Sequence, residues 1–345
     1  MRRVLITGGA GFLGTHLSES FRAAGLCVRL FDRVPPPDWA HVRGLEYVQG
    51  DIRDSAAVGE ALQGAGSVVH GAFASPRQTT QLMHAVNVEG TRQLCAAALE
   101  RGASRFILIS STIVTKPERK HPLLNDAPLS RLDAYRQSRA EAEQVISDFA
   151  TRGLSAAIVR PKTFVGPGRV GAFAIIFDWI RQGAPVPVLG GGENRYQLLH
   201  IEDMARGICQ LEASRAQGVF FFGARQFCTV REDLQTLLDY TRTGARLRFI
   251  PAALARFGMR SMEWAGLVPL SEWHQMSAQG QDSVVDILRA QRELGWQPLW
   301  SNADALRSAY DWYLASLAYT GSAPTTHPLP LSHRILKGVL QIFPE

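Results

Sequence analysis

Three glycines, spaced at every third position, follow a short apolar run at the start of the chain. The run covers residues 4–7, and the glycines are Gly8, Gly11 and Gly14. Between a strand and a helix, the first glycine permits a tight turn and the second lets the backbone approach a pyrophosphate. The third allows the helix to pack closely on the strand, and the helix N-terminus offers free N–H groups to phosphates. The segment therefore predicts a dinucleotide site.

Short β-rich runs alternate with longer amphipathic segments through the first half of the chain. We predict strands over residues 4–7, 27–31, 46–49, 67–70, 106–110 and 156–159, and helices over residues 12–24, 55–62, 79–101 and 132–151. The strands are almost wholly apolar, as expected where helices cover both faces of a parallel sheet. The predicted fold class is α/β, with a Rossmann-type doubly wound parallel sheet and a smaller mixed C-terminal substrate region.

Acidic residues at the ends of the second and third predicted strands bear on the choice of cofactor. The carboxylate of Asp32 can accept hydrogen bonds from both adenosine ribose hydroxyls and would repel a 2′-phosphate, which favours NAD. Arg33 keeps NADP as the alternative, because a guanidinium can pair with that phosphate. Asp51 and Ile52 are placed to touch the adenine, although the aspartate could instead cap a helix. Helix capping is the role we expect for Asp54.

Composition excludes several classes of partner. The 345 residues are 46% hydrophobic and 20% charged, which is typical of a globular protein with one large or two packed domains. The formal charge of +6 suits an anionic partner, but the arginines are scattered, so we expect no nucleic acid. No run approaches the roughly 18 apolar residues of a spanning helix, and the first strand leaves no room for a signal peptide. We therefore expect a cytoplasmic protein.

The cysteines point to buried thiols. Cys27, Cys95, Cys209 and Cys228 are far apart in the sequence and form no CxxC pair. Three of them lie in apolar runs, so we predict buried cysteines and no metal site.

A tyrosine and a cation stand four residues apart near the start of the helix predicted over residues 132–151. Tyr135 and Arg139 would share one helical face, so the positive charge can stabilise a phenolate and make the tyrosine a usable acid/base. Ser110 and Ser111 end a predicted strand, and a serine hydroxyl could hold a substrate oxygen beside that phenol. For each of these residues the alternative is a capping or surface role.

Together with the glycine turn, these features make the chain resemble the extended short-chain dehydrogenase/reductase family. That family includes nucleotide-sugar epimerases and dehydratases and the 3β-hydroxysteroid dehydrogenases. The resemblance covers nearly the whole chain. The further motifs are Gly50-Asp51-Ile52-Arg53-Asp54, Val69-His70-Gly71-Ala72, Asn87-Val88-Glu89-Gly90-Thr91, Arg160-Pro161 with Gly166-Pro167-Gly168, and Glu293-Leu294-Gly295-Trp296-Gln297-Pro298.

The resemblance implies a role for several residues. Ser111 matches the catalytic serine or threonine, and Tyr135 matches the catalytic tyrosine. Ala72 and Phe73 match the loop over the cofactor. Asn87 matches a structural asparagine that ties together the surroundings of the fourth strand.

The chain departs from the family at Arg139, which stands where the YxxxK motif has lysine. Arginine keeps the positive charge but effectively never gives up its proton, so it can keep the electrostatic role and not a proton-relay role. Our hypothesis is an active NAD-dependent enzyme with Arg139 as its cation. The competing interpretation is a catalytically weak relative that binds NAD as a scaffold.

Two substrate classes fit the motifs. Arg195 follows a glycine-rich turn much as a phosphate-binding arginine does in the sugar epimerases, which favours a nucleotide sugar. Thr163, however, stands where many of these enzymes carry an asparagine. The segment between His70 and Asn87 is also short and lacks the proline and tyrosine that those epimerases place before the asparagine. The Arg160-Pro161 segment looks more like the steroid dehydrogenases, so we lean to an apolar, sterol-like alcohol, with loss of a C4 carboxylate as an extension. Residues 172–180 are unusually apolar, and we favour a buried helix over a lipid-contacting wall.

The predicted sites and parts of the chain follow. The cofactor contacts are Gly8, Gly11, Phe12, Leu13, Asp32, Arg33, Asp51, Ile52, Ala72, Phe73, Ser110, Tyr135, Arg139, Pro161 and Thr163, and the substrate contacts are Ser111, Thr112 and Arg195. Residues 1–162 form the NAD-binding Rossmann domain, and residues 163–320 form a substrate-binding region interleaved with the last strands. Residues 321–345 form a Pro-rich linker and a basic amphipathic tail, which could contact a membrane peripherally or dock on protein. The resemblance also implies a homodimer through the helices predicted at 79–101 and 132–151.

Overall fold

The computed structural model describes residues 2–42, 45–116, 121–168, 170, 173–251 and 281–320. The chain divides into two compact units. The first comprises Met1–Lys162, Ile201–Gly223 and Val285–Pro298, and the second comprises Thr163–His200, Ala224–Val284 and Leu299–Glu345. The predicted amphipathic tail at 321–345 lies outside the described residues.

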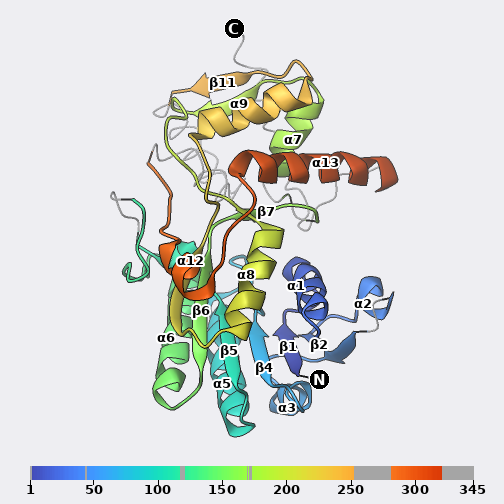
Figure 1. Cartoon of the computed structure of the whole chain (residues 1–345), viewed down its shortest axis with the longest axis vertical. Helices are drawn as coiled ribbons and strands as arrows, with labels where there is room; N and C mark the ends of the chain where they lie inside the picture. The colour runs from blue at the N-terminus through green and yellow to red at the C-terminus, as the bar shows by residue number, and fades with distance from the viewer. Residues whose placement is uncertain are drawn as a thin grey trace. The chain divides into compact units, whose positions relative to one another are not determined.

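A seven-stranded sheet, parallel throughout, organises the first unit (Figure 1). Its strands are β1 (Arg3–Thr7), β2 (Cys27–Asp32), β3 (Glu46–Gln49), β4 (Ser67–His70), β5 (Arg105–Ile109), β6 (Ala156–Pro161) and β10 (Gly218–Phe222). They lie in the order β10-β6-β5-β4-β1-β2-β3, which is the Rossmann order with one strand added beyond β6. The predicted fold class is confirmed. The added strand β10 comes from the part of the chain where the alternation of strands and helices weakens.

Both faces of this sheet are covered by helices. On β1, Leu5 faces a cluster shared with α3, α5 and α6, while Val4 and Ile6, which point the opposite way, are at most 1% exposed. The helices of this unit are α1 (Phe12–Ala23), α2 (Asp38–Val42), α3 (Ser55–Ala61), α4 (Thr80–His84), α5 (Thr91–Glu100), α6 (Ala134–Thr151), α8 (Ile201–Ala213) and α12 (Leu288–Leu294). Asp54 accepts hydrogen bonds from the backbone N–H groups of Ala56 and Ala57, which confirms it as the N-cap of α3.

The single helix predicted over residues 79–101 is wrong in one respect. A π-helical segment, Ala85–Gly90, separates α4 from α5 and buries Asn87 and Thr91 completely. A π-turn adds a residue to the helical repeat, and hydrophobic periodicity does not reveal such an insertion. Gly90 lies in this turn against Ile52, where a Cβ atom would approach the isoleucine Cγ2 to 2.7 Å.

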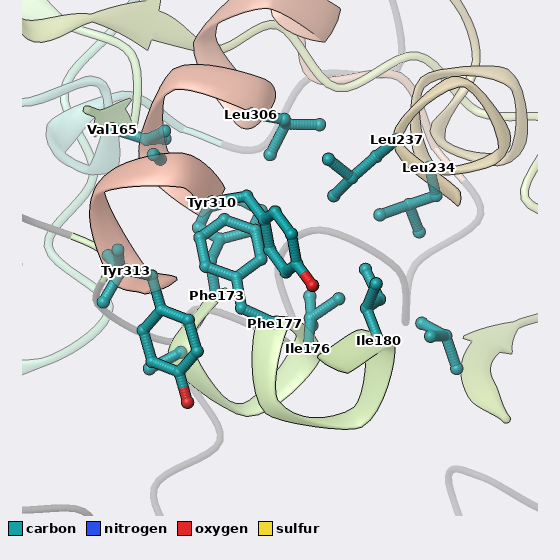
Figure 2. Close-up of a cluster of buried hydrophobic side chains, with 14 of the residues drawn as sticks. Val165, Phe173, Ile176, Phe177, Ile180, Leu234, Leu237, Leu306, Tyr310 and Tyr313 are labelled. Atoms are coloured by element: carbon teal, nitrogen blue, oxygen red, sulfur yellow. The ribbon is translucent and has the colours of Figure 1, made fainter. Parts of the chain in front are cut away.

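The second unit is built around an apolar core (Figure 2). Its elements are β7 (Phe164–Val165), α7 (Phe173–Arg181), β8 (Val186–Leu189), β9 (Leu199–His200), α9 (Val230–Thr241), β11 (Leu247–Ile250) and α13 (Asn302–Thr320). The ring of Phe177 lies edge-on to Tyr310, with 5.4 Å between the ring centroids. Six of the nine residues of α7 are buried in this core, so the buried-helix interpretation of the described part of segment 172–180 is confirmed.

The expectation of buried cysteines holds for one residue. Cys95 is buried, Cys27 and Cys209 are half-buried, and Cys228 is exposed. An apolar sequence neighbourhood does not ensure burial, because alternate residues of a strand or helix face opposite ways. In the part of the chain that the structure describes, no helix is long and apolar enough to cross a membrane.

A buried ion pair fixes α6 to the sheet. Arg160 on β6 donates from Nε and Nη2 to the carboxylate of Glu143 on α6, with the shortest contact at 2.6 Å. The two side chains are 5% and 3% exposed. The attraction between the two charges offsets part of the cost of taking both out of water, but either charge alone would be buried without a partner.

We predict that Glu143→Gln lowers the free energy of unfolding by about 3–5 kcal/mol, because the Arg160 guanidinium would lose its counter-charge. Urea unfolding at neutral pH measures the change. Glu141→Gln on the same helix is the matched control, since Glu141 makes a half-exposed contact with His84 at 3.8 Å. Equal effects of the two substitutions would contradict the prediction.

Candidate active site

The glycine turn after β1 has no room for side chains at its two ends. Gly8 has φ +70°, in the left-handed region, and a Cβ atom there would lie 2.8 Å from the carbonyl oxygen of Gly71. A Cβ atom on Gly14 would lie 2.1 Å from the carbonyl oxygen of Gly9. The first glycine thus permits the turn, and the third lets α1 pack against it, as the spacing predicts.

The helix that follows the turn begins without a side-chain cap. Gly11 is the N-cap of α1 and makes no side-chain hydrogen bond to the first helical turn. The backbone N–H of Ala10 donates to Oδ2 of Asp32 at 3.1 Å, which places that carboxylate at the turn. A helix N-terminus without a side-chain cap, beside a fixed carboxylate, fits the pyrophosphate and the ribose hydroxyls of a dinucleotide.

The residues predicted to surround the adenine are partly engaged with one another. Asp51 accepts hydrogen bonds from Nε and Nη2 of Arg53 at 2.9 and 2.7 Å, and also from the Arg53 backbone. These bonds, with the nearby charge of Arg33, lower the pKa of Asp51. Ile52 is 5% exposed and packs in the core, and its carbonyl oxygen accepts a hydrogen bond from Nε2 of Gln93 at 3.3 Å.

A buried histidine joins β1 to the π-helix. His70 lies at the end of β4. Its Nδ1 is 2.7 Å from Oγ1 of Thr7, and its Nε2 is 2.9 Å from Oγ1 of Thr91. Thr91 gives its own proton to the Asn87 carbonyl at 2.6 Å, so it must accept from the histidine. Nε2 therefore carries the proton, Nδ1 accepts from Thr7, and the imidazole is neutral. Complete burial, helped by the charge of Arg139, lowers the pKa of His70 to about 3.

The same network continues to the helix that carries Tyr135. The Asn87 side chain accepts from the backbone N–H of Ala74 at 2.7 Å and donates to Oγ of Ser138 at 2.9 Å. Ser138 in turn donates to the carbonyl oxygen of Tyr135 at 2.9 Å. Asn87 thus ties the loop after β4 to the start of α6, in the structural position that the family resemblance implies.

Tyr135 and Ser111 lie on neighbouring elements that one arginine joins. Ser111 is the N-cap of a 3₁₀-helix, Thr112–Val114, and its Oγ accepts from the backbone N–H of Ile113 at 3.3 Å. Arg136 on α6 donates from Nε to the carbonyl oxygen of Ile113 at 3.2 Å. Ser111 therefore has the capping role, yet its hydroxyl keeps a proton to donate.

Arg139 is buried at the carboxyl end of the sheet. Its Nη2 donates to the carbonyl oxygen of Ile109 at 2.8 Å, and its guanidinium carbon lies 3.4 Å from the ring centroid of Phe73. Burial lowers the pKa of Arg139, and the nearby Tyr135 and Glu143 oppose this shift. Among the described residues, neither Nε of Arg139 nor the buried Oγ of Ser110 has a hydrogen-bond partner. Two unpartnered polar atoms at this edge of the sheet fit the binding of NAD beside Tyr135.

Comparison with known proteins identifies the family. The model of the family described as "NAD dependent epimerase/dehydratase family" matches residues 4–220. The chain belongs to this family. It is therefore an enzyme of the extended short-chain dehydrogenase/reductase type with NAD as its cofactor, as the motifs predict.

Curated relatives and solved structures similar to this chain carry names of different activities. The chain is 32% identical over 339 residues to the uncharacterized protein y4nG of Sinorhizobium fredii, covering 97% of this chain and 85% of that one. It is 26% identical to a 3β-hydroxysteroid dehydrogenase/Δ5→4-isomerase of Mycobacterium tuberculosis, covering 91% and 90% of the two chains. UDP-glucuronic acid 4-epimerase of Bacillus cereus, solved with NAD, superposes with a TM-score of 0.72 at 20% identity over 90% and 98% of the chains. At that identity, the structural likeness shows the fold alone.

In this NAD-dependent family member, two predicted ligand contacts of the second unit are engaged within that unit. Oγ1 of Thr163 lies 2.7 Å from the hydroxyl of Tyr196. The Arg195 guanidinium donates to Oδ2 of Asp282 at 2.9 and 2.5 Å. An anionic ligand of Arg195 would have to compete with that carboxylate.

Sequence reasoning missed part of the site. The motif Val69-His70-Gly71-Ala72 contains His70, but nothing local shows that its partners are Thr7 and Thr91. Lys162 follows Pro161 at the end of β6 and is 3% exposed, and burial lowers its pKa to about 7. The available signal is that Lys162 closely follows the apolar run at residues 156–159, although lysine is rarely fully buried.

We predict that His70 makes folding sensitive to acid. Its pKa is about 3 in the folded chain, against 6.5 as its ordinary value. The unfolded chain therefore binds a proton that the folded chain excludes between these pH values, and stability falls as pH falls through this window. Relative to His70→Asn, the native chain should lose up to about 1.4 kcal/mol per pH unit there. Urea unfolding of both proteins at several pH values between 3 and 6.5 measures this difference. The same dependence of the free energy of unfolding on pH in the two proteins would refute the prediction.

We predict that Asp32→Asn shifts the cofactor preference towards NADP by about 100-fold, as the ratio of the two dissociation constants. The asparagine amide still accepts a hydrogen bond from Ala10 but no longer repels a 2′-phosphate. The guanidinium of Arg33 can then pair with that phosphate. Titration with each cofactor measures the ratio. Asp38→Asn, at an exposed position, is the control. An unchanged ratio in Asp32→Asn would count against the assigned role of this carboxylate.

Proposed function

We propose that the protein oxidises a secondary alcohol to a ketone with Tyr135 as the proton acceptor, Ser111 as the residue that holds the substrate oxygen, and Arg139 as the cation. The observation that carries this proposal is the buried Arg139 guanidinium, fixed by Ile109 and close enough to Tyr135 for the two charges to interact. A fixed positive charge in a buried setting stabilises negative charge that develops beside it during the reaction.

The proposed step balances as follows. NAD, when bound, supplies the acceptor for the hydride that leaves the carbinol carbon. The hydroxyl proton moves to the Tyr135 phenolate oxygen while the carbon–oxygen double bond forms. Ser111 donates its remaining proton to the substrate oxygen and so orients it. Arg139 keeps its protons throughout and acts only through its charge.

We propose an apolar, sterol-like alcohol as the substrate class. The 3β-hydroxysteroid dehydrogenase relative, which aligns with almost the whole chain, supports this choice. The pairing of Arg195 with Asp282 also supports it, because the proposed diphosphate-binding cation already has a counter-charge. If the alcohol stands beside a carbon that bears a carboxylate, the new ketone could accept the electrons of decarboxylation as an enolate.

A nucleotide sugar is the second candidate. The favouring observation is the position of Arg195 directly after a glycine-rich turn, with 49% of its side chain exposed. An exposed guanidinium can exchange Asp282 for a phosphate. A panel of 3β-hydroxysterols and UDP-sugars, followed by NADH absorbance and product analysis, separates the two classes. Turnover of sugars alone would overturn the sterol proposal.

We predict that Tyr135→Phe lowers kcat by about 10²- to 10⁴-fold and weakens NAD binding far less, because only the hydroxyl that accepts the proton is lost. Steady-state kinetics on the substrate found by the panel, with cofactor titration, provide the test. Tyr240→Phe in the second unit is the matched control. Native-like turnover of Tyr135→Phe would show that another group accepts the proton.

Two predictions about assembly stay predictions. A homodimer through the helical segments 79–101 and 132–151 is testable by light scattering. Peripheral membrane contact through residues 321–345 is testable by vesicle co-sedimentation of the full chain against a chain ending near Ser322.

A further inference from the structure

The Arg139 guanidinium is held by two different contacts. In its plane, Nη2 donates to the carbonyl oxygen of Ile109 at 2.8 Å. Against its flat face lies the ring of Phe73, with 3.4 Å from the guanidinium carbon to the ring centroid. A planar cation can use its edge for a hydrogen bond and its face for an aromatic ring at the same time.

The ring of Phe73 is itself fixed by the buried network. It packs on His70, with 5.1 Å between the ring centroids, and against the apolar core of the first unit. His70 is held by hydrogen bonds to Thr7 and Thr91. His70, at the end of β4, thus fixes the half-buried ring of Phe73, and this ring fixes the position of the guanidinium.

We infer that Phe73 is a positioning residue for Arg139, and that its ring makes arginine, and not lysine, the cation that this site requires. A lysine at position 139 would carry its charge on a compact ammonium, which has no flat face to cover the ring. The lysine ammonium could donate to Ile109 or lie over the ring of Phe73, but it could not make both contacts as the guanidinium does. Arg139→Lys, although it restores the motif typical of the family, should therefore weaken the site.

A double-mutant cycle tests the inference without relying on turnover. Phe73→Leu, Arg139→Lys and the double variant are compared with the native chain by NAD affinity and by thermal unfolding of the cofactor-free protein. If Phe73 acts through Arg139, Phe73→Leu should weaken NAD binding roughly 10- to 30-fold in the native background. It should have almost no effect in the Arg139→Lys background. The same coupling should appear in the unfolding temperatures.

Conservative variants sharpen the result. Phe73→Trp keeps an aromatic face and should retain NAD affinity, whereas Phe73→Leu should lose it. Phe249→Leu is the matched control, because Phe249 is 43% exposed and lies 5.2 Å from Arg231, an exposed pair in the second unit. Additive effects of Phe73→Leu and Arg139→Lys on both readouts would overturn the inference and assign Phe73 a direct contact with the cofactor.

A kinetic test of the positioning role rests on the proposed function, and its outcomes distinguish a failure of that function from a failure of the positioning role. Once a substrate is known, Arg139→Lys and Phe73→Leu should lower kcat more than they raise KM, because the charge is needed in the transition state. Coupling in the cofactor-free protein without turnover on any alcohol would leave the positioning role standing and remove the proposed chemistry. Turnover with native-like kinetics in Arg139→Lys would remove the positioning role alone.

Discussion

A continuous chain of hydrogen bonds, buried except for its last bond, connects the end of β1 to the helix that carries the proposed proton acceptor. It runs from Thr7 through His70 and Thr91 to Asn87, and from there through Ser138 to the backbone of Tyr135. Each member is satisfied only if the next has one orientation, so the imidazole has one tautomer and Asn87 has one amide orientation. The strand ends, the loop after β4 and the start of α6 are therefore fixed together.

Charge on α6 complements this network. Arg139, Glu143 and Arg160 form a buried series of alternating sign, in which the carboxylate is paired with Arg160 and lies close enough to Arg139 to interact with it. Burial alone would make a guanidinium costly at this place, and the carboxylate one helical turn away offsets part of that cost. The helix can thus keep a permanent cation beside Tyr135 inside the protein. The stack on Phe73 then fixes where that cation lies.

Some features of the fold and the site could be predicted because their causes are local. The turn Gly8 to Gly14 and the cap at Asp54 depend on residues that are neighbours in the sequence, and both take the predicted form. The π-turn around Asn87 could not be predicted, because it is selected by burial against Ile52 and Ser138, which are distant in the sequence. The same reason explains the cysteines, whose burial depends on which face of an element they occupy.

The sequence by itself determined the Rossmann sheet, the glycine turn after β1 and the residue types of the proposed active site, since periodicity and motif spacing act over a few residues. Only the tertiary structure decided which atoms meet. It gave Arg139 its contacts with Ile109 and Phe73, gave His70 its neutral tautomer, and paired Arg195 with Asp282, 87 positions apart. These outcomes depend on desolvation and on partners supplied by distant segments, and no local pattern encodes either.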